Sequence, residues 1–234
     1  MPPIAAPEAA PALLPLHLDG LRFTVGGRAI LDIPALSVTP GAFVVLRGPS
    51  GAGKSTALAL IAGMMRPTAG RIVWGGTDLA TLPDGARRRF RRQHFGLVFQ
   101  DYRLFPELDA QANAALAAGW APRPRRAAIT DRAAEALAGL GLGAAATRRV
   151  AVMSGGARQR IAVARALATD PVALLADEPT ASLDRPNADR LADDLARLAG
   201  RRTLIVVSHD PAVQARAGRL ITLADGRIVE DTGA

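Results

Sequence analysis

Short apolar stretches, glycines and alanine-rich segments follow one another along the chain and divide its first two thirds into two regions. Between 18 and 45 the apolar stretches are separated by Gly-Gly and Pro-Gly pairs, and another stretch at 70–75 ends in glycine. This spacing predicts an antiparallel group of strands. Residues 107–169 are alanine-rich and helical in pattern, and one helix is predicted from Thr130 to Leu140.

The last third of the chain has a different pattern, with two continuous apolar runs at 171–177 and 202–208. Runs of this kind are typical of strands buried on both faces of a parallel sheet. A helical pattern over 187–198 joins them, which predicts a βαβ unit, and residues 220–229 have the pattern of a hairpin. The sequence therefore predicts an α/β fold.

A complete phosphate-binding loop, Gly-x4-Gly-Lys-Ser, stands between a predicted strand at 42–46 and a predicted helix at 55–62. Its glycines allow backbone N–H groups to surround an anion, and the helix N-terminus adds partial positive charge. A glycine-rich turn with a chance lysine is the alternative, and the flanking strand and helix argue against it. The residues predicted to bind nucleotide are Gly48, Pro49, Ser50, Gly51, Ala52, Gly53, Lys54, Ser55 and Thr56.

Lys54 is the single lysine among 29 basic residues, all the others being arginine. A compact ammonium reaches the β- and γ-phosphates where a broad guanidinium fits poorly. The Ser55 hydroxyl is a candidate ligand of Mg²⁺. The predicted chemistry is therefore that of a nucleotide, ATP, with Mg²⁺.

Composition limits the partners and the compartment. No apolar run approaches the roughly 18 residues of a membrane span, and the absence of cysteine fits a cytoplasmic protein. The net charge of +8 raises the question of a nucleic-acid partner. Aromatic residues are only 4% and no known nucleic-acid-binding motif is present, so no such partner is expected. The arginine run at 87–92 is interpreted as a solvated face that could lie near lipid headgroups.

The domain prediction is a disordered leader at 1–15, because prolines repeat there without a basic start, followed by a single domain at 16–232. The helical segment at about 101–169 is predicted to be a subdomain of that single domain.

Asp177 and Glu178 follow the apolar run at 171–177, where parallel sheets place their ligands. Asp177 suits the Mg²⁺ shell, and Glu178 could deprotonate a water in line with the γ-phosphate. Taken alone the pair is a weak signal, and a helix N-cap explains it equally well.

A second candidate anion site begins at Ser154, Gly155 and Gly156, which precede a helical pattern with one buried face. On this segment alone an ordinary serine-capped helix is the simpler interpretation.

Together these motifs resemble the ATPase subunit of ABC transporters, over almost all of the chain from about Leu16 to Val229. The resemblance implies a RecA-like P-loop core with an antiparallel β subdomain and an α-helical subdomain. It also implies a head-to-tail homodimer, in which the Ser154 segment of one copy closes over ATP held by the loop of the other.

The resemblance extends to three other positions. Gln100 matches the glutamine that reaches Mg²⁺ and the attacking water, and His209 matches the histidine on the γ-phosphate. Ser182, Leu183 and Asp184 match the loop that signals across the dimer. The implied catalytic residues are therefore Glu178, His209 and Gln100, and the implied metal ligands are Ser55, Gln100 and Asp177.

The segments 99–106 and 175–180 look like the branch that contains the lipoprotein-release, macrolide-efflux and cell-division ATPases. The resemblance implies a separate integral membrane permease subunit and a peripheral location at the cytoplasmic face of the inner membrane. Tyr102, Leu104 and Phe105 would lie in the groove that receives the partner's coupling helix. Core of the helical segment is the alternative.

The sequence departs from the family at two positions. Ala157 replaces the glutamine that ends the signature, which implies slower turnover. Val25 stands where an aromatic residue stacks on adenine, which weakens stacking by about 0.5–1.5 kcal/mol unless Phe23 substitutes.

The implied function is ATP hydrolysis that powers a membrane transporter. Two rivals stay open: an ATPase that regulates cell-wall enzymes through a membrane subunit, and a soluble ABC ATPase of DNA repair or translation. The length of 234 residues disfavours the second, because such proteins carry coiled-coil insertions or two nucleotide domains.

Overall fold

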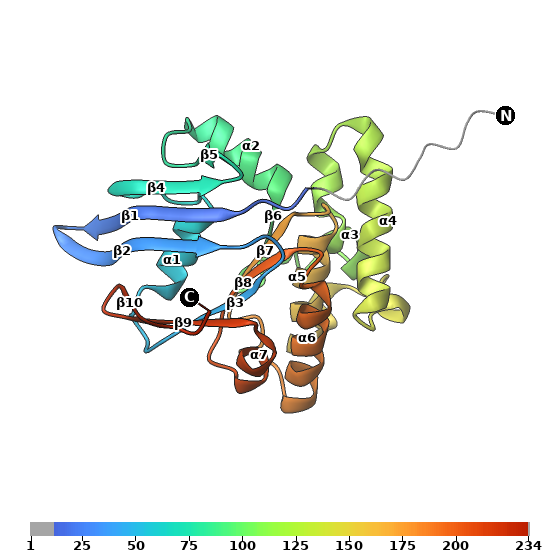
Figure 1. Cartoon of the computed structure of the whole chain (residues 1–234). Helices are drawn as coiled ribbons and strands as arrows, with labels where there is room; N and C mark the ends of the chain where they lie inside the picture. The colour runs from blue at the N-terminus through green and yellow to red at the C-terminus, as the bar shows by residue number, and fades with distance from the viewer. Residues whose placement is uncertain (1–11, 234) are drawn as a thin grey trace.

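The computed structural model of the chain describes residues 12–233, in which two β-sheets lie beside a group of helices (Figure 1). The larger sheet has the strand order β10-β9-β3-β8-β7-β6. Its neighbouring strands run parallel, except that β10 is antiparallel to β9. The bounds are Phe43–Arg47 for β3, Phe95–Val98 for β6, Ala173–Asp177 for β7, Thr203–Val207 for β8, Arg219–Ala224 for β9 and Arg227–Asp231 for β10.

The smaller sheet is antiparallel, with the order β2-β1-β4-β5, and confirms the predicted group of strands in the first part of the chain. Its strands are β1 (Leu16–Val25), β2 (Arg28–Val38), β4 (Ala69–Trp74) and β5 (Thr77–Asp78). Most of the predicted leader, residues 1–11, lies outside the described residues. At its end Leu13 and Leu14 pack against the core beside this sheet.

The central strands are buried on both faces, which explains their continuous apolar sequences. Side chains alternate across a strand, so Leu204 and Val206 of β8 enter one hydrophobic core while Ile205 and Val207 enter the other. The first core joins the sheet to the helical segment, and the second joins it to α1 (Lys54–Ile61) and the antiparallel sheet. The parallel strands β7 and β8, joined by α6 (Arg185–Leu198), form the predicted βαβ unit.

The helical segment contains α3 (Ala110–Ala114), η1 (Leu116–Trp120), α4 (Arg123–Gly139), η2 (Gly143–Ala145), η3 (Val150–Val152) and α5 (Gly155–Leu167). The prediction that a helix starts at Thr130 is wrong, since α4 begins at Arg123, seven residues earlier. Pro124 lies in the first turn of α4, where a missing N–H costs no hydrogen bond. Thr130 is instead inside the helix, with its hydroxyl donating to the carbonyl of Arg126 at 3.1 Å.

The arginine run forms most of α2 (Asp84–His94), and only part of it is the solvated face that the sequence predicts. Arg88, Arg89 and Arg92 are exposed, but Arg87 is buried and paired with Asp84 at 2.8 Å. The remaining helix, α7 (Pro211–Arg216), packs beside α6. Within residues 12–233 no helix combines the length and the apolar character needed to cross a bilayer.

Candidate functional site

The phosphate-binding loop connects β3 to α1, as the sequence predicts. Gly48 and Gly53 have φ angles of 136° and 93°. A Cβ atom at Gly48 would lie 2.0 Å from the carbonyl oxygen of Leu223, and one at Gly53 would lie 2.8 Å from the side chain of Leu31. Both the backbone conformation and the close neighbours therefore require glycine at these two positions.

Lys54 lies over its own loop, with Nζ donating to the carbonyl oxygens of Gly48 and Pro49, both at 2.8 Å. The residue is buried, at 7% exposure. Since an ammonium group has three donors, one N–H remains to reach a phosphate. The loop therefore holds the only lysine of the chain in place before a nucleotide arrives.

A cleft of about 380 Å³ brings Lys54 and Ser55 together with Gln100, Glu178 and His209. The last three residues follow the carboxyl ends of β6, β7 and β8. These strands are parallel neighbours in the sheet, so their ends meet at one edge, where ligands bind in folds of this kind. The three implied catalytic residues thus lie in one cleft with Lys54, although His209 is 155 positions from Lys54 in the chain.

Glu178 lies against His209, with Oε1 and Nε2 3.0 Å apart, although Oε1 makes no aligned hydrogen bond. Burial raises the pKa of Glu178 above its ordinary value, and the charge and backbone N–H of His209 oppose that rise without cancelling it. Glu178 also has a left-handed backbone, with a φ of 47°, a conformation often stored at functional sites. A carboxylate whose pKa is raised accepts a proton more readily, as a general base must.

Asp177 lines a smaller cavity of about 40 Å³ together with Ser55. Its Oδ1 atom is buried and has no hydrogen-bond partner. An orphaned carboxylate oxygen beside a serine hydroxyl fits Mg²⁺, which is held by one or two protein oxygens together with substrate phosphates. No group of three His, Cys, Asp or Glu that could hold a metal lies within residues 12–233.

The second predicted phosphate-binding segment lies apart from this cleft. Ser154 caps α5, and its hydroxyl accepts a hydrogen bond from the backbone N–H of Ala157 at 3.3 Å. Neither Ser154 nor Gly155 nor Gly156 lines the cleft around Lys54. Within one copy of the chain, the Lys54 cleft and the Ser154 segment are therefore separate.

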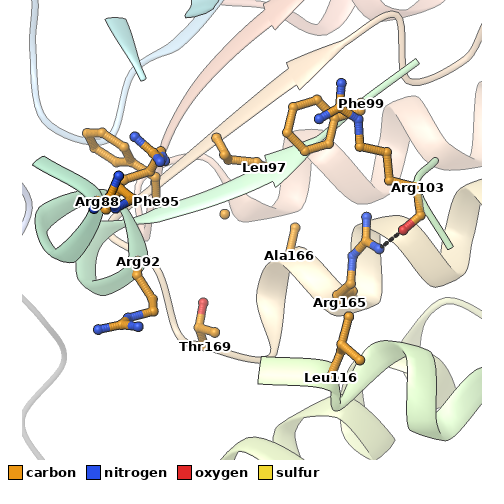
Figure 2. Close-up of a pocket in the computed structure, with 12 residues that line it drawn as sticks. Arg88, Arg92, Phe95, Leu97, Phe99, Arg103, Leu116, Arg165, Ala166 and Thr169 are labelled. Carbon is orange, nitrogen blue, oxygen red and sulfur yellow. Dashed lines mark hydrogen bonds between the residues drawn. The ribbon is translucent and has the colours of Figure 1, made fainter. Parts of the chain in front are cut away.

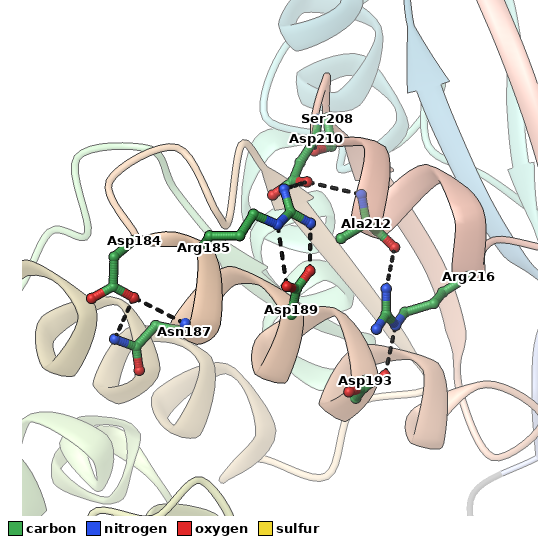
Figure 3. Close-up of polar contacts among 9 residues, drawn as sticks. All are labelled: Asp184, Arg185, Asn187, Asp189, Asp193, Ser208, Asp210, Ala212 and Arg216. Carbon is green, nitrogen blue, oxygen red and sulfur yellow. Dashed lines mark hydrogen bonds and ion pairs between the residues drawn. The ribbon is translucent and has the colours of Figure 1, made fainter.

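The two glycines pack against the loop that precedes α6. A Cβ atom at Gly155 would lie 3.4 Å from the carbonyl oxygen of Ser182, and one at Gly156 would lie 3.3 Å from Leu183. The next residue, Asp184, caps α6 (Figure 3). The segment that begins at Ser154 and the loop before α6 are therefore in direct contact.

The residues considered for adenine stacking do not line the cleft. Val25 is 57% exposed, and Phe23 packs against the hydrophobic core. A register shift between Phe23 and Thr24 interrupts β1, so the simple alternation that would place both residues on one face does not hold. The apolar side chains that do line the cleft are Val207 of β8 and Ile30 of β2. Ile30 carries no motif, so the sequence gives no signal for it.

Tyr102 and Leu104 are partly buried against the helical core, as the core alternative states, while Phe105 is 48% exposed. None of these residues lines the two grooves of about 460 and 580 Å³ near this segment, whose walls include Arg165 and Leu116. The backbone turns at Tyr102 and Arg103, which both have positive φ angles. That these three residues receive a helix of a partner stays a prediction.

A family model described as ABC transporter matches residues 31–181, more than half of the chain. The chain belongs to the ABC transporter family. It is an ATP-binding cassette, the ATPase module of that family, as the motifs predict. The predicted fold and branch are also confirmed by relatives and by solved structures.

Two relatives belong to the predicted branch. The lipoprotein-releasing system ATP-binding protein LolD 1 of Rhodospirillum rubrum is 41% identical, over 95% of this chain and 99% of that protein. The macrolide export ATP-binding/permease protein MacB of Marinobacter nauticus is 43% identical, over 89% of this chain. An Fe(3+) ions import ATP-binding protein, FbpC of Streptomyces coelicolor, is 42% identical. The chain spans 33% of this MacB and 61% of FbpC.

The solved structures that resemble this cassette include the dimer of the ATP-binding cassette MJ0796 in a post-hydrolysis state, bound to ADP and Pi. The two share 32% sequence identity with a TM-score of 0.83, over 92% of this chain and 97% of that one. A second dimeric structure of the same bacterial cassette superposes equally well.

Proposed function

We propose that this cassette is the ATP-hydrolysing subunit of a membrane transporter, and that ATP drives two copies together. The observation that carries the proposal is the separation of the two half-sites, because the Lys54 cleft and the Ser154 segment do not meet within one chain. A head-to-tail homodimer would place each serine-capped helix over the nucleotide of the other copy. The dimeric structures of the similar MJ0796 cassette support this arrangement.

Within each site the residues divide the work. Lys54 and the loop N–H groups hold the phosphates, and Ser55 and Asp177 would hold Mg²⁺, which neutralises charge on the phosphates when bound. Glu178 takes the proton from the attacking water, and the proximity of His209 places an imidazole beside that carboxylate. Gln100 lines the same cleft and orients the water.

The partner in this proposal is a separate integral membrane permease subunit, with the cassette bound peripherally at the cytoplasmic face of the inner membrane. Two features support it: the names of the relatives, which describe export, release and import systems, and the absence within residues 12–233 of a helix that could span a membrane. The relatives handle different cargo, so the cargo is set by the permease.

The test uses Glu178→Gln, which keeps the size of the side chain and removes its basicity. We expect the variant to bind MgATP, to hydrolyse it at least about a hundredfold more slowly, and to elute as a dimer in size-exclusion chromatography with light scattering. An ATP-loaded variant that stays monomeric would contradict the shared site. Identification of the membrane protein that co-purifies with the wild type separates a transporter from a regulator of cell-wall enzymes.

A further inference from the structure

The loop that follows β6 carries Gln100 into the nucleotide cleft. Two positions further on, Tyr102 and Arg103 both have left-handed backbones, with φ angles of 58° and 48°. Residues with a side chain disfavour this conformation, because Cβ comes too close to the following carbonyl oxygen. Two such residues in succession persist only where neighbouring contacts fix them. The position of this loop therefore depends on a contact that holds it.

Arg165 of α5 makes that contact (Figure 2). One of its terminal nitrogens, Nη2, donates to the carbonyl oxygen of Tyr102 at 2.6 Å, and the other, Nη1, donates to the carbonyl oxygen of Arg103. A guanidinium presents its N–H donors in one plane, so a single side chain can fix the directions of two successive carbonyls. The two hydrogen bonds thus hold the left-handed pair in place.

The guanidinium of Arg165 lies in surroundings that do not favour a charge. Burial lowers its pKa, the charge of Arg103 lowers it further, and the charge of Asp101 opposes both effects. Asp101 is paired with Arg103 at 3.2 Å, while the hydrogen bonds of Arg165 go to backbone carbonyls. A partly buried cation costs free energy, which favours a role for Arg165 in the geometry of the loop.

The other contacts of the loop are local. The guanidinium of Arg103 lies 4.0 Å from the centre of the Phe99 ring, and the backbone N–H of Arg103 donates to the carbonyl of Asp101 at 2.6 Å. These contacts keep residues 99–103 compact, but they move with the loop. Arg165 comes from another element, 63 positions after Tyr102, and so fixes the loop relative to the rest of the cassette.

We propose that Arg165 is a positioning residue for ATP hydrolysis, which keeps Gln100 beside the attacking water by holding the carbonyls of Tyr102 and Arg103. This inference rests on the proposed function, in which Gln100 orients that water. Arg165 does not line the cleft itself, so it acts through the backbone that follows Gln100. Its loss should therefore slow hydrolysis and leave the phosphate contacts of Lys54 intact.

The first experiment measures the loop in the absence of nucleotide. The chain has no cysteine, so Gln100→Cys, at an exposed position, gives a single site for a nitroxide spin label. We expect Arg165→Ala to increase the mobility of the label in electron paramagnetic resonance spectra. Arg132→Ala is the matched control, because Arg132 is also half-buried and donates to the carbonyl of Ala168 at 3.0 Å, just past the end of α5. An unchanged spectrum with Arg165→Ala, or an equal change with Arg132→Ala, would overturn the proposal.

The second experiment separates turnover from binding. Arg165→Ala should lower kcat by about ten- to a hundredfold, as displacement of a catalytic group by about 1 Å does. The affinity of the monomer for a fluorescent ATP analogue should stay within about twofold of wild type, because Lys54 and its loop are untouched. Arg132→Ala should keep the wild-type kcat. A normal kcat with Arg165→Ala, or a loss of affinity with kcat unchanged, would contradict the positioning role.

Arg165→Met is the second variant, because it fills most of the same space without a charge or a donor. It should fold even where Arg165→Ala does not, and it should show the same loss of kcat. Urea unfolding checks the stability of both. Recovery of the wild-type kcat by Arg165→Met would mean that Arg165 acts through packing alone.

A double-mutant cycle tests whether Arg165 acts through Gln100. Gln100→Ala combined with Arg165→Met should hydrolyse ATP within about twofold of Gln100→Ala alone, since the second change removes support from a side chain that is already absent. Losses that multiply would show that Arg165 acts elsewhere.

The same measurements separate this inference from the proposed function. If the wild type hydrolyses no ATP, the proposed function fails, while the spin label still reports whether Arg165 holds the loop. If the wild type and Arg165→Met hydrolyse ATP equally well, the positioning role fails alone. Normal hydrolysis by Gln100→Ala would overturn the assignment of the water to Gln100, and this inference with it.

Discussion

The guanidinium of Arg185 lies 3.0 Å from the carboxylate of Asp210, and this contact joins the start of α6 to the loop that follows β8 (Figure 3). Arg185 directly follows Asp184, and Asp210 directly follows His209. Burial acts to raise the pKa of Asp210, but hydrogen bonds from the Ala212 backbone and from the Thr180 and Arg185 side chains outweigh it and lower the pKa. Asp210 is therefore ionised and anchors Arg185.

Arg185→Ala should slow ATP turnover by no more than a few fold, with little effect on the ATP affinity of the monomer. The reason is that the exposed contact between Arg185 and Asp210 no longer holds the Asp184 loop against the His209 loop. Steady-state hydrolysis and nucleotide titration measure the two effects. Arg197→Ala is the control, since Arg197 pairs with Asp194 on the same helix and touches neither loop. Equal slowing in both variants would show that only general stability has changed.

Lys54→Ala should lose nucleotide affinity itself, by roughly ten- to a hundredfold or more, because a hydrogen bond from a charged donor contributes about 1.5–3 kcal/mol. Lys54→Arg should fail to rescue it, since the ammonium is buried and bonded to two loop carbonyls, and a planar guanidinium does not fit there. Titration with a fluorescent ATP analogue measures both variants. Normal ATP hydrolysis by Lys54→Ala would refute the central assignment of the site.

The sequence predicts those parts of the fold in which the pattern of apolar residues along the chain matches the burial of the strand or helix. Strands β7 and β8 are apolar from Ala173 to Ala176 and from Leu204 to Val207 because both faces are buried, so their existence and parallel order follow from the sequence. Asp177 and Glu178, at the end of β7, follow with them. The matches of Gln100 and His209, by contrast, came from the family resemblance.

The parts that the sequence does not predict depend on contacts between distant segments. A groove of about 460 Å³ is lined by both Arg88 of α2 and Arg165 of α5, from two helices separated in the chain by β6 and most of the helical segment (Figure 2). No local sequence pattern indicates that these two residues lie at one groove. Ile30 enters the cleft because a hairpin carries it there. No glycine or proline marks the bulge between Phe23 and Thr24. From the sequence, Phe23 and Val25 are therefore expected on the same face of the strand, which the register shift rules out.

Asp231 and Arg219 form a two-point ion pair, with both hydrogen bonds between 2.6 and 2.7 Å. The hydrogen bond from Arg219 lowers the pKa of Asp231 below its ordinary value of 3.8, although burial opposes it. The unfolded chain therefore binds more protons at acidic pH. The stabilisation is complete above the unfolded pKa and is lost as pH falls through the folded pKa.

Asp231→Asn should thus destabilise the chain at pH 7, by about 1.5–3 kcal/mol for a charge-assisted pair that is mostly buried. The difference from wild type should shrink as the pH is lowered through about 4 and below. Urea unfolding at several pH values measures it. Asp19→Asn, at an exposed position of β1, is the control and should show no such dependence. A difference that stays constant with pH would mean that Asp231 contributes through packing instead.

Base selectivity should be weak in this cassette, because Val25 is exposed and Phe23 is partly buried against the core. Among residues 12–233, no Phe, Tyr or Trp lines the cleft. The affinities for ATP and GTP should then differ by only a few fold, since the triphosphate supplies most of the binding. Val25→Tyr should raise ATP affinity by roughly two- to twelvefold, as a stack of about 0.5–1.5 kcal/mol allows. Phe23→Ala should leave the ratio of the two affinities unchanged while it lowers stability. A preference for ATP of well over tenfold in the wild type, abolished by Phe23→Ala, would contradict this prediction. It would mean that Phe23 moves away from the core and stacks on adenine.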